Sequence, residues 1–279
     1  MKTTNLTSVA IAVLLGTVML AGAGCTNSKT NQETSDNMET LNLTQEWDKK
    51  FPQSDKVNHR KVTFKNRYGI TLAADLYEPK NVEGKLAAIA VSGPFGAVKE
   101  QTSGLYAQTM AERGFLTLAF DPSYTGESGG EPRNVASPDI NTEDFSAAVD
   151  FLTALSDVDA ERIGIIGICG FGGMGLNAAA MDTRIKATVA STMYDMSRVN
   201  ANGYFDAEDS ADDRNKKREM MNVIRTRDAQ SGTITPGVPG LPDSITGEEP
   251  QFVKDYFDYY KTNRGFHVRS INSNGAWSP

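Results

Sequence analysis

Cysteine and histidine are scarce in this sequence of 279 residues, which contains two of each. Cys25 and Cys169 lie far apart, and Cys25 falls in a segment that we expect to be processed, so no disulfide framework is available. His59 and His267 stand alone, and no CxxC or HxxxH spacing exists. Because zinc and related metals need clustered ligands, the sequence predicts no metal site.

An excess of basic charge is also absent. Lys and Arg total 28 against 35 Asp and Glu, which gives a formal net charge of −7. Binding to the phosphate backbone needs a basic face, so nucleic acid is not an expected partner. With 39% hydrophobic and 23% charged residues, the composition is that of an ordinary globular protein of one large or two small domains.

A hydrophobic run long enough to span a membrane is missing from the N-terminus, where the apolar stretch covers only residues 9–20. Lys2 precedes this stretch, and the small residues 21–24 separate it from Cys25. This pattern predicts a secretory signal peptide over residues 1–24. The small residues before Cys25 resemble the lipobox of bacterial lipoproteins, which implies lipid attachment at Cys25. We therefore expect a chain anchored to the bacterial cell envelope, facing outside the cytoplasm.

Residues 25–60 are expected to form a polar tether and N-terminal extension, because residues 26–40 contain almost nothing apolar that could drive folding. Strand-like segments begin after this stretch. Residues 62–64 and 70–77 flank a turn-rich spacer and predict an antiparallel hairpin. Buried central strands are predicted by short apolar runs at residues 86–91, 115–120 and 163–168, and a further strand by residues 185–190.

Helical patterns separate these strands. Residues 101–113 end before Gly114, a suitable C-terminal cap, and residues from Asn141 onward carry a capping side chain, acids and an apolar face. A third helix is expected to start after Cys169. The alternation predicts the α/β class, with a doubly wound sheet and an antiparallel entry hairpin over residues 61–193.

The alternation stops in residues 194–279, which we expect to form a cap or insert over the carboxyl edge of the sheet. Residues 206–218 run from acidic to basic and predict a solvated helix or loop face. The Gly- and Pro-rich residues 231–250 predict a loop. Four aromatic side chains recur at helical spacing and are interpreted as packing: Phe252, Tyr256, Tyr259 and Tyr260.

The candidate chemistry lies in residues 163–173, IGIIGICGFGG, which predict a strand, a sharp glycine-rich turn and a helix start. Cys169 occupies the nucleophile position, where a helix N-terminus favours the thiolate. The Gly170 N–H is expected to face the developing oxyanion. The second donor should come from the loop after an earlier strand. There we favour the N–H of Phe95, with Gly96 as second choice.

These segments resemble an α/β-hydrolase of the dienelactone-hydrolase-like branch, close to proteins described as polyketide thioesterase-like or X-Pro-peptidase-like. The resemblance covers residues 62–193 and rests on residues 93–101 (GPFGAVKEQ), residues 121–129 (DPSYTGESG), Arg162 with the strand start, and the Cys169 turn. It implies hydrolysis of ester, thioester or lactone bonds with a small acyl substrate and no cofactor.

The sequence departs from the family pattern in two places. Phe171 stands where a small residue is usual, and we expect it to displace the Gly170 amide. The family also has an acid and a His after the nucleophile, whereas here only His267 follows, with Asp255 or Asp258 as the nearest acids in order. His59 precedes the sheet and is not expected to act as the base. The sheet is accordingly expected to be incomplete at its C-terminal side.

Two other functions remain open from the sequence. Residues 170–175 spell GxGxxG with Asp195 20 positions beyond Gly175, a pattern found in dinucleotide-binding oxidoreductases. The fingerprint, however, normally opens the first strand–helix–strand unit. The other alternative is a non-catalytic or truncated envelope lipoprotein, because no convincing base accompanies Cys169. The sequence does not indicate an oligomeric state.

Overall fold

The computed structural model describes residues 40–278. The predicted signal peptide at residues 1–24, the lipid-attachment residue Cys25 and most of the predicted tether lie outside these residues. Within the described part, no helix is both long and apolar enough to cross a membrane.

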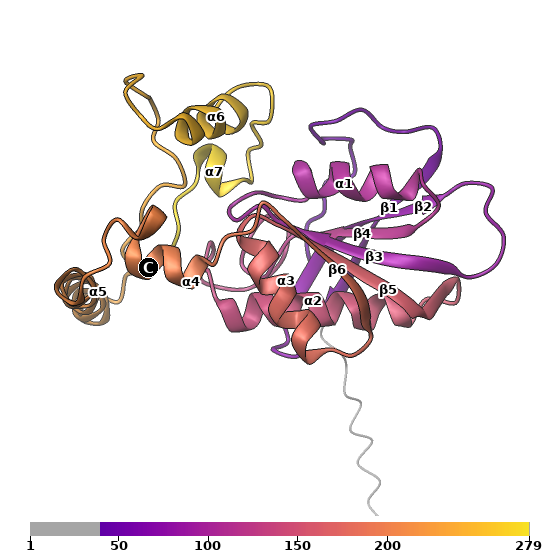
Figure 1. Ribbon diagram of the computed structural model, residues 1–279, viewed down its shortest axis with the longest axis horizontal. Coiled ribbons are helices and arrows are strands. Elements are labelled where there is room, and N and C mark those ends of the chain that lie inside the picture. Colours follow the sequence, from indigo (N-terminus) through magenta and orange to yellow (C-terminus); the bar gives the residue numbers. More distant parts are fainter. Residues whose placement is uncertain (1–39, 279) are drawn as a thin grey trace, which may run out of the picture. The chain divides into compact units, whose positions relative to one another are not determined.

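The described chain alternates strands and helices up to residue 191 and is helical beyond it (Figure 1). The strands are β1 (Val57–Lys65), β2 (Thr71–Pro79), β3 (Leu86–Ser92), β4 (Leu116–Phe120), β5 (Val158–Ile168) and β6 (Ile185–Ser191). The helices are α1 (Thr102–Ala111), α2 (Pro138–Thr153), α3 (Gly170–Met181), α4 (Met196–Asn202), the 3₁₀ turn η1 (Tyr204–Asp206), α5 (Ala211–Ser231), α6 (Gln251–Tyr260) and α7 (Ile271–Asn274).

The strands form one mixed sheet with the order β1-β2-β4-β3-β5-β6. β1 pairs with β2 and β2 with β4 in antiparallel fashion, whereas the pairs β3–β4, β3–β5 and β5–β6 are parallel. The predicted α/β class, with its antiparallel entry hairpin, is confirmed.

Apolar side chains on alternate positions of the strands build a core on each face of the sheet, and Figure 1 shows α1 on one face with α2 and α3 on the other. In β3, Ala88 and Ala90 belong to the core under α2 and α3, while Ile89 and Val91 belong to the core under α1. Both faces are covered, which is why the central strands are continuous apolar runs.

The strand order reverses between β3 and β5, which are neighbours in the sheet. The chain leaves β3 toward β4 on one side and crosses back to β5 on the other. Loops that diverge in this way leave a crevice at the carboxyl ends of the two strands, where α/β proteins bind ligands. The loop beginning at Gly93 and the turn at Cys169 lie at this point.

Two predicted helix boundaries differ in the structure. α2 begins at Pro138, three residues before the expected Asn141, because the Ser137 side chain caps the helix by accepting from the Ile140 N–H and proline fits the first turn. α1 ends at Ala111, and Gly114 (φ +95°) lies beyond its last turn. The chain therefore turns toward β4 slightly earlier than the helical pattern indicates.

The segment after β6 divides into an exposed and a docked part. α5 buries no side chain, in agreement with the predicted solvated face. α5 extends to Ser231, and residues 232–250 form no helix or strand, although Pro239 makes an isolated bridge with Ala276. Residues 265–277 lie against the loop after β3, where the Gln101 side chain donates to the Gly265 carbonyl (2.5 Å).

Candidate active site

Cys169 lies between β5 and α3 with a backbone that side chains rarely adopt (φ +57°, ψ −126°). Such a conformation costs about 1–3 kcal/mol and persists only where the surroundings enforce it. Two glycines permit the turn. A Cβ at Gly167 would lie 2.2 Å from the Phe171 carbonyl oxygen, and one at Gly170 would lie 2.7 Å from the Met196 side chain. The chain thus presents the thiol at the end of a central strand.

Two backbone amides meet at this thiol. The N–H groups of Gly170 and Phe95 both act on the Cys169 sulfur and lower its pKa. The structure therefore brings together the nucleophile and the two donors that the sequence indicates, while the carbonyl of Gly96, the second-choice residue, accepts from Ser270 and Asn272. Donors that converge beside a nucleophile can stabilise negative charge on an acyl oxygen bound there.

Phe171 does not displace the Gly170 amide, contrary to the expectation from the sequence. Its ring is buried, 6.3 Å from the ring of Phe145 and 6.3 Å from that of Phe95. The large side chain points into the core under α2 and α3, so the turn above it keeps its shape. Its bulk supports the loop that carries Phe95.

The thiol of Cys169 is harder to ionise than an ordinary cysteine. Burial raises its pKa, and the N–H groups of Gly170 and Phe95 lower it without offsetting the burial. The Gly170 N–H at the start of α3 thus favours the thiolate, as expected, but burial outweighs it. No Lys, Arg or His is among the described groups that shift this pKa.

Neither histidine of the sequence contacts the thiol in the described structure. The His267 ring is buried, with Nε2 3.4 Å from the Asp48 carboxylate and Nδ1 accepting from the Arg269 N–H. His59 Nε2 lies 2.7 Å from Asp75. Both rings thus contact carboxylates that belong to ionic clusters away from Cys169. No general base for Cys169 is assigned among residues 40–278.

The two acids considered as partners of His267 are also engaged elsewhere. Asp255 accepts from the Gln251 side chain, and Asp258 pairs with Arg264 (2.7 Å) on the exposed side of α6. A triad of Cys169, either acid and His267 is not formed.

A buried ionic cluster lies behind the loop after β3. The Lys99 ammonium is inaccessible to solvent and is 2.7 Å from Glu100, 2.8 Å from Asp121 and 2.7 Å from Glu127. Although burial opposes it, these carboxylates hold the pKa of Lys99 well above its usual range. The Lys99 backbone N–H also donates to Asp121 (2.8 Å), which ties the loop after β3 to the loop after β4.

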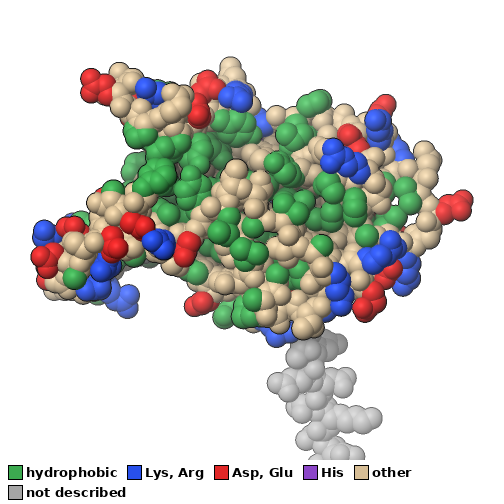
Figure 2. Space-filling model, in the orientation of Figure 1, with side chains coloured by type: hydrophobic (Ala, Val, Ile, Leu, Met, Phe, Trp, Pro, Cys, Tyr) green, Lys and Arg blue, Asp and Glu red, His purple; other side chains and the backbone are tan. Residues whose placement is uncertain are grey.

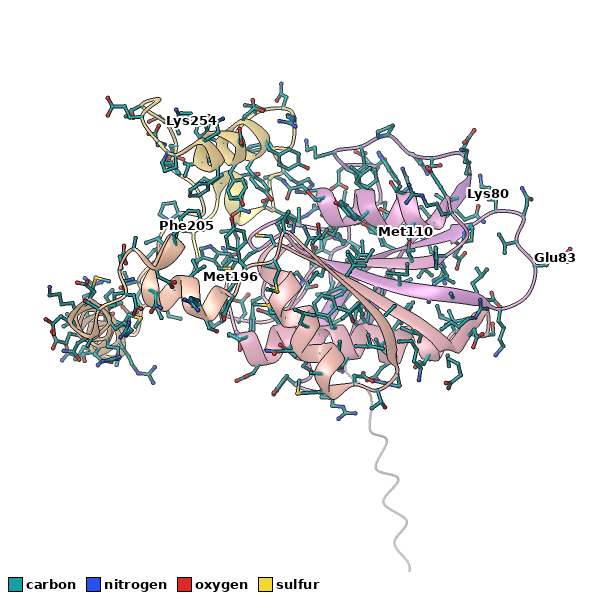
Figure 3. The ribbon with its side chains drawn as sticks, in the orientation of Figure 1. Lys80, Glu83, Met110, Met196, Phe205 and Lys254 are labelled. Carbon is teal, nitrogen blue, oxygen red and sulfur yellow. The ribbon has the colours of Figure 1, made fainter. Side chains whose placement is uncertain are left out.

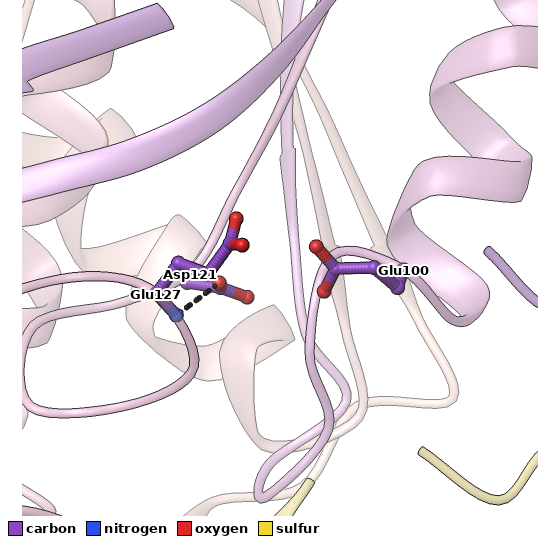
Figure 4. Close-up of side chains that lie close together, drawn as sticks. All are labelled: Glu100, Asp121 and Glu127. Atoms are coloured by element: carbon purple, nitrogen blue, oxygen red, sulfur yellow. Dashed lines mark hydrogen bonds between the residues drawn. The ribbon is translucent and has the colours of Figure 1, made fainter. Parts of the chain in front are cut away.

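Carboxylate oxygens of Glu100, Asp121 and Glu127 approach one another closely enough to bind a metal ion (Figure 4). The Glu127 N–H donates to Asp121 within this group (2.9 Å). Lys99 places its ammonium within hydrogen-bond distance of all three residues, so the position of a cation is already taken by a side chain. The cluster is a structural ion network.

Neither this cluster nor the side chains that extend it were predicted from the sequence. Arg269 contacts Glu100 (3.2 Å) and Glu127 (3.5 Å) as well as Asp48 (2.5 Å), and Lys61 contacts Glu127 (2.5 Å). Lys99 and Glu100 belong to the motif at residues 93–101, so their place in the loop after β3 could be predicted from the sequence. Their long-range partners carried no local signal.

A mixed sheet with a strained cysteine turn and two converging amides at its switch point is the arrangement of an α/β hydrolase. The solved α/β hydrolase GrgF from Penicillium sp. sh18 has the same fold, with a TM-score of 0.57 at 22% identity over 77% of this chain and 71% of its own.

The chain belongs to the S15 family of X-Pro dipeptidyl-peptidases, whose sequence profile matches residues 68–233. An uncharacterized protein of Pseudomonas aeruginosa, PA2218, is 61% identical over 271 residues, which are 96% of this chain and 72% of the relative. The crystal structure of PA2218 aligns with a TM-score of 0.82 at 64% identity, covering 86% of this chain and 74% of the other.

A more distant relative carries a named activity. The thiohydrolase aneE of Aspergillus aculeatus is 31% identical over 137 residues, which cover 49% of this chain and 42% of the relative. The resemblance to hydrolases is thus confirmed at the level of the fold and family, which favours a hydrolase over a dinucleotide-dependent oxidoreductase.

Proposed function

We propose that the protein hydrolyses ester or thioester bonds through Cys169. The observation that carries the proposal is the convergence of the Gly170 and Phe95 N–H groups on the sulfur of a strained turn at the end of β5. The thiohydrolase among the relatives supports thioesters as one of the substrate types.

The proposed reaction has two steps. In the first, the thiolate of Cys169 attacks the acyl carbonyl carbon, the Gly170 and Phe95 amides hold the oxyanion, and the C–O or C–S bond to the leaving group breaks. The leaving alkoxide or thiolate takes up a proton from solvent. In the second step, water adds to the thioester carbonyl, and the acid is released as the thiol is regenerated.

Acylation by an activated ester tests this proposal. We expect 4-nitrophenyl acetate to release a burst of nitrophenolate and to leave one acetyl group on the peptide that contains Cys169, as measured by mass spectrometry. Cys169→Ala should abolish the burst, whereas Cys25→Ala, which removes the other cysteine, should retain it. Absence of the adduct, or an adduct unchanged in Cys169→Ala, would favour the non-catalytic lipoprotein instead.

A further inference from the structure

Aromatic side chains of the C-terminal segment run from the cysteine turn to α6. The Tyr194 N–H donates to the Cys169 carbonyl (3.2 Å), which fixes the start of this series at the turn. Successive ring centroids are 5.8, 5.1, 5.9 and 6.5 Å apart along Tyr194, Tyr204, Phe252, Tyr256 and Tyr260. We call these five residues the aromatic wall.

The series of contacts returns to the thiol from the other side. The Asn272 side chain acts on the Tyr260 hydroxyl, whose pKa it lowers, and Asn272 Nδ2 donates to the Phe95 carbonyl (2.8 Å). Phe95 stacks on Trp277 with 4.2 Å between ring centroids, and its N–H lowers the pKa of Cys169. The contacts that begin at the Cys169 turn therefore return to Cys169 through Asn272 and Phe95, and most of the side chains along them are aromatic.

The side chains of the aromatic wall are partly exposed to solvent. Of the ten residues of α6 only Tyr260 is buried, although the aromatic stripe of an amphipathic helix is normally covered. Tyr204 is 42% exposed. Figure 2 shows hydrophobic side chains gathered between α6 and α4, and Figure 3 labels Met196 and Phe205 in the same part of the chain. Packing alone, the role expected for the α6 stripe, does not account for this exposure.

Within the described structure, no charged group acts on the Cys169 thiol. Burial, followed by contact with neighbouring groups that include Cys169, raises the pKa of the hydroxyls of Tyr204, Tyr256 and Tyr260, so all three remain protonated phenols at neutral pH. No cation is among the groups that act on the Cys169 thiol. A carboxylate on the substrate would lose hydration here without gaining an ion pair.

We propose, building on the proposed function, that Cys169 accepts bulky, uncharged acyl groups that carry rings, held by Tyr204, Phe252 and Tyr256. Planar rings stack favourably on aromatic side chains and gain from the apolar area that they bury. A small acetyl group offers little apolar area to the wall, and an acyl group with a second carboxylate gains no ion pair at the thiol.

Three esters that share the 4-nitrophenolate leaving group and differ in the acyl group test the proposal: 4-nitrophenyl 2-naphthoate, 4-nitrophenyl acetate and mono-4-nitrophenyl succinate. Each acylation rate is divided by the rate with N-acetylcysteine, which removes differences in intrinsic reactivity. We expect the corrected rate to be highest for the naphthoate and lowest for the succinate. A corrected rate for acetate or succinate equal to that for naphthoate would overturn the proposal.

Variants of the aromatic wall locate the effect. Phe252→Ala and Tyr204→Ala should each lower the corrected naphthoate rate about tenfold, as expected for the loss of a half-buried aromatic contact, and should lower the acetate rate much less. Tyr68→Ala, which removes an aromatic side chain that is 59% exposed near the β1–β2 turn, is the control. Equal losses for both esters, or none, would contradict a ring-binding wall.

Binding of an unreactive ligand, measured in a variant that cannot be acylated, tests the ring-binding site independently of the proposed hydrolysis. In Cys169→Ala protein, calorimetry with 2-acetylnaphthalene should detect binding that Phe252→Ala weakens about tenfold, while acetone should show none. If no ester acylates Cys169 and 2-acetylnaphthalene still binds, the proposed hydrolysis fails and the ring-binding site stands. If acetate acylates Cys169 and 2-acetylnaphthalene does not bind, the reverse holds.

Discussion

The N–H groups of Gly170 and Phe95 both lower the pKa of the Cys169 thiol, yet this pKa lies above the ordinary value because burial outweighs them. The residue sequence around it predicted the turn and the donors, since both depend on glycines and strand position. Local sequence does not report how much water reaches a side chain, and that quantity decides the sign of the pKa shift.

Lys99 has an equally specific environment, because three carboxylates surround its ammonium without access to solvent. Removing this charge leaves the carboxylates buried and uncompensated. We expect Lys99→Met to lower the free energy of unfolding by about 3–5 kcal/mol, measured by urea denaturation.

The matched control for Lys99 is Lys85→Met, which removes the same side chain from an exposed position before β3. It should change the free energy of unfolding by less than about 0.5 kcal/mol. Similar effects of the two substitutions would mean that the cluster does not stabilise the fold.

Among the elements, the loop after β3 and the short helix α7 are directly joined. Asn272 donates from its side chain to the Phe95 carbonyl (2.8 Å) and from its backbone to the Gly96 carbonyl (3.1 Å). Ser270 Oγ donates to the same Gly96 carbonyl (2.9 Å). With these two carbonyls held by α7, the preceding peptide can direct the Phe95 N–H toward the thiol.

Asn272→Asp should impair this arrangement, because a carboxylate cannot donate to the Phe95 carbonyl and repels it. We expect the limiting acylation rate to fall about 10- to 100-fold, with an unchanged half-saturating ester concentration. The pKa of Cys169, measured from the pH dependence of its reaction with iodoacetamide, should rise further because the Phe95 N–H lowers it in the native chain.

Two variants separate the donor from the added charge. Asn272→Ala removes the donor alone and should reproduce most of the loss. Asn274→Asp places the same negative charge on the exposed side of α7 and should have little effect. A thiol pKa that is unchanged in Asn272→Ala would rule out a positioning role for this side chain.

The regular elements could largely be predicted from the sequence. The buried strands β3, β4 and β5 were visible as apolar runs because both of their faces are covered. The start of α2 was missed although Ser137 and Pro138 form a readable cap, since the later Asn141 offered a competing signal. The contact of α7 with the loop after β3 was not predictable, because Asn272 and Phe95 are 177 residues apart.

For the whole molecule, the buried ionic cluster connects segments that are distant in the sequence. Arg269 bridges Asp48, near the start of the described chain, to Glu100 and Glu127 at the sheet, and the pair with Asp48 spans 221 residues. Complementary charges so far apart have no pattern in the sequence, so this part of the architecture could not be predicted.

This cluster makes the stability of the protein sensitive to acid. Although burial opposes it, Lys99 and Lys61 hold the pKa of Glu127 at about 2, below its ordinary value of 4.5. A lowered carboxyl pKa stabilises the folded state fully above the ordinary value, and the contribution is lost as the pH falls toward 2. We expect thermal unfolding temperatures to fall over this interval.

Glu127→Gln should weaken that acid dependence while lowering stability near neutral pH, because the amide does not titrate. Glu83→Gln, an exposed position labelled in Figure 3, should leave the curve of unfolding temperature against pH unchanged. If the unfolding temperature fell equally with decreasing pH in Glu127→Gln and in the native protein, the role of this carboxylate would be contradicted.

The contact between Asn272 and Phe95 also sets an order of events during synthesis. Translation proceeds at about 5–20 residues per second, so the ribosome needs roughly 5–20 s to pass from Cys169 to Asn272. During that interval the nascent chain can form β3, β4 and β5, but the loop that carries Phe95 lacks the side chain that holds it. The loop that carries Phe95 therefore gains its contact with Asn272 only after all six strands of the sheet have been synthesised.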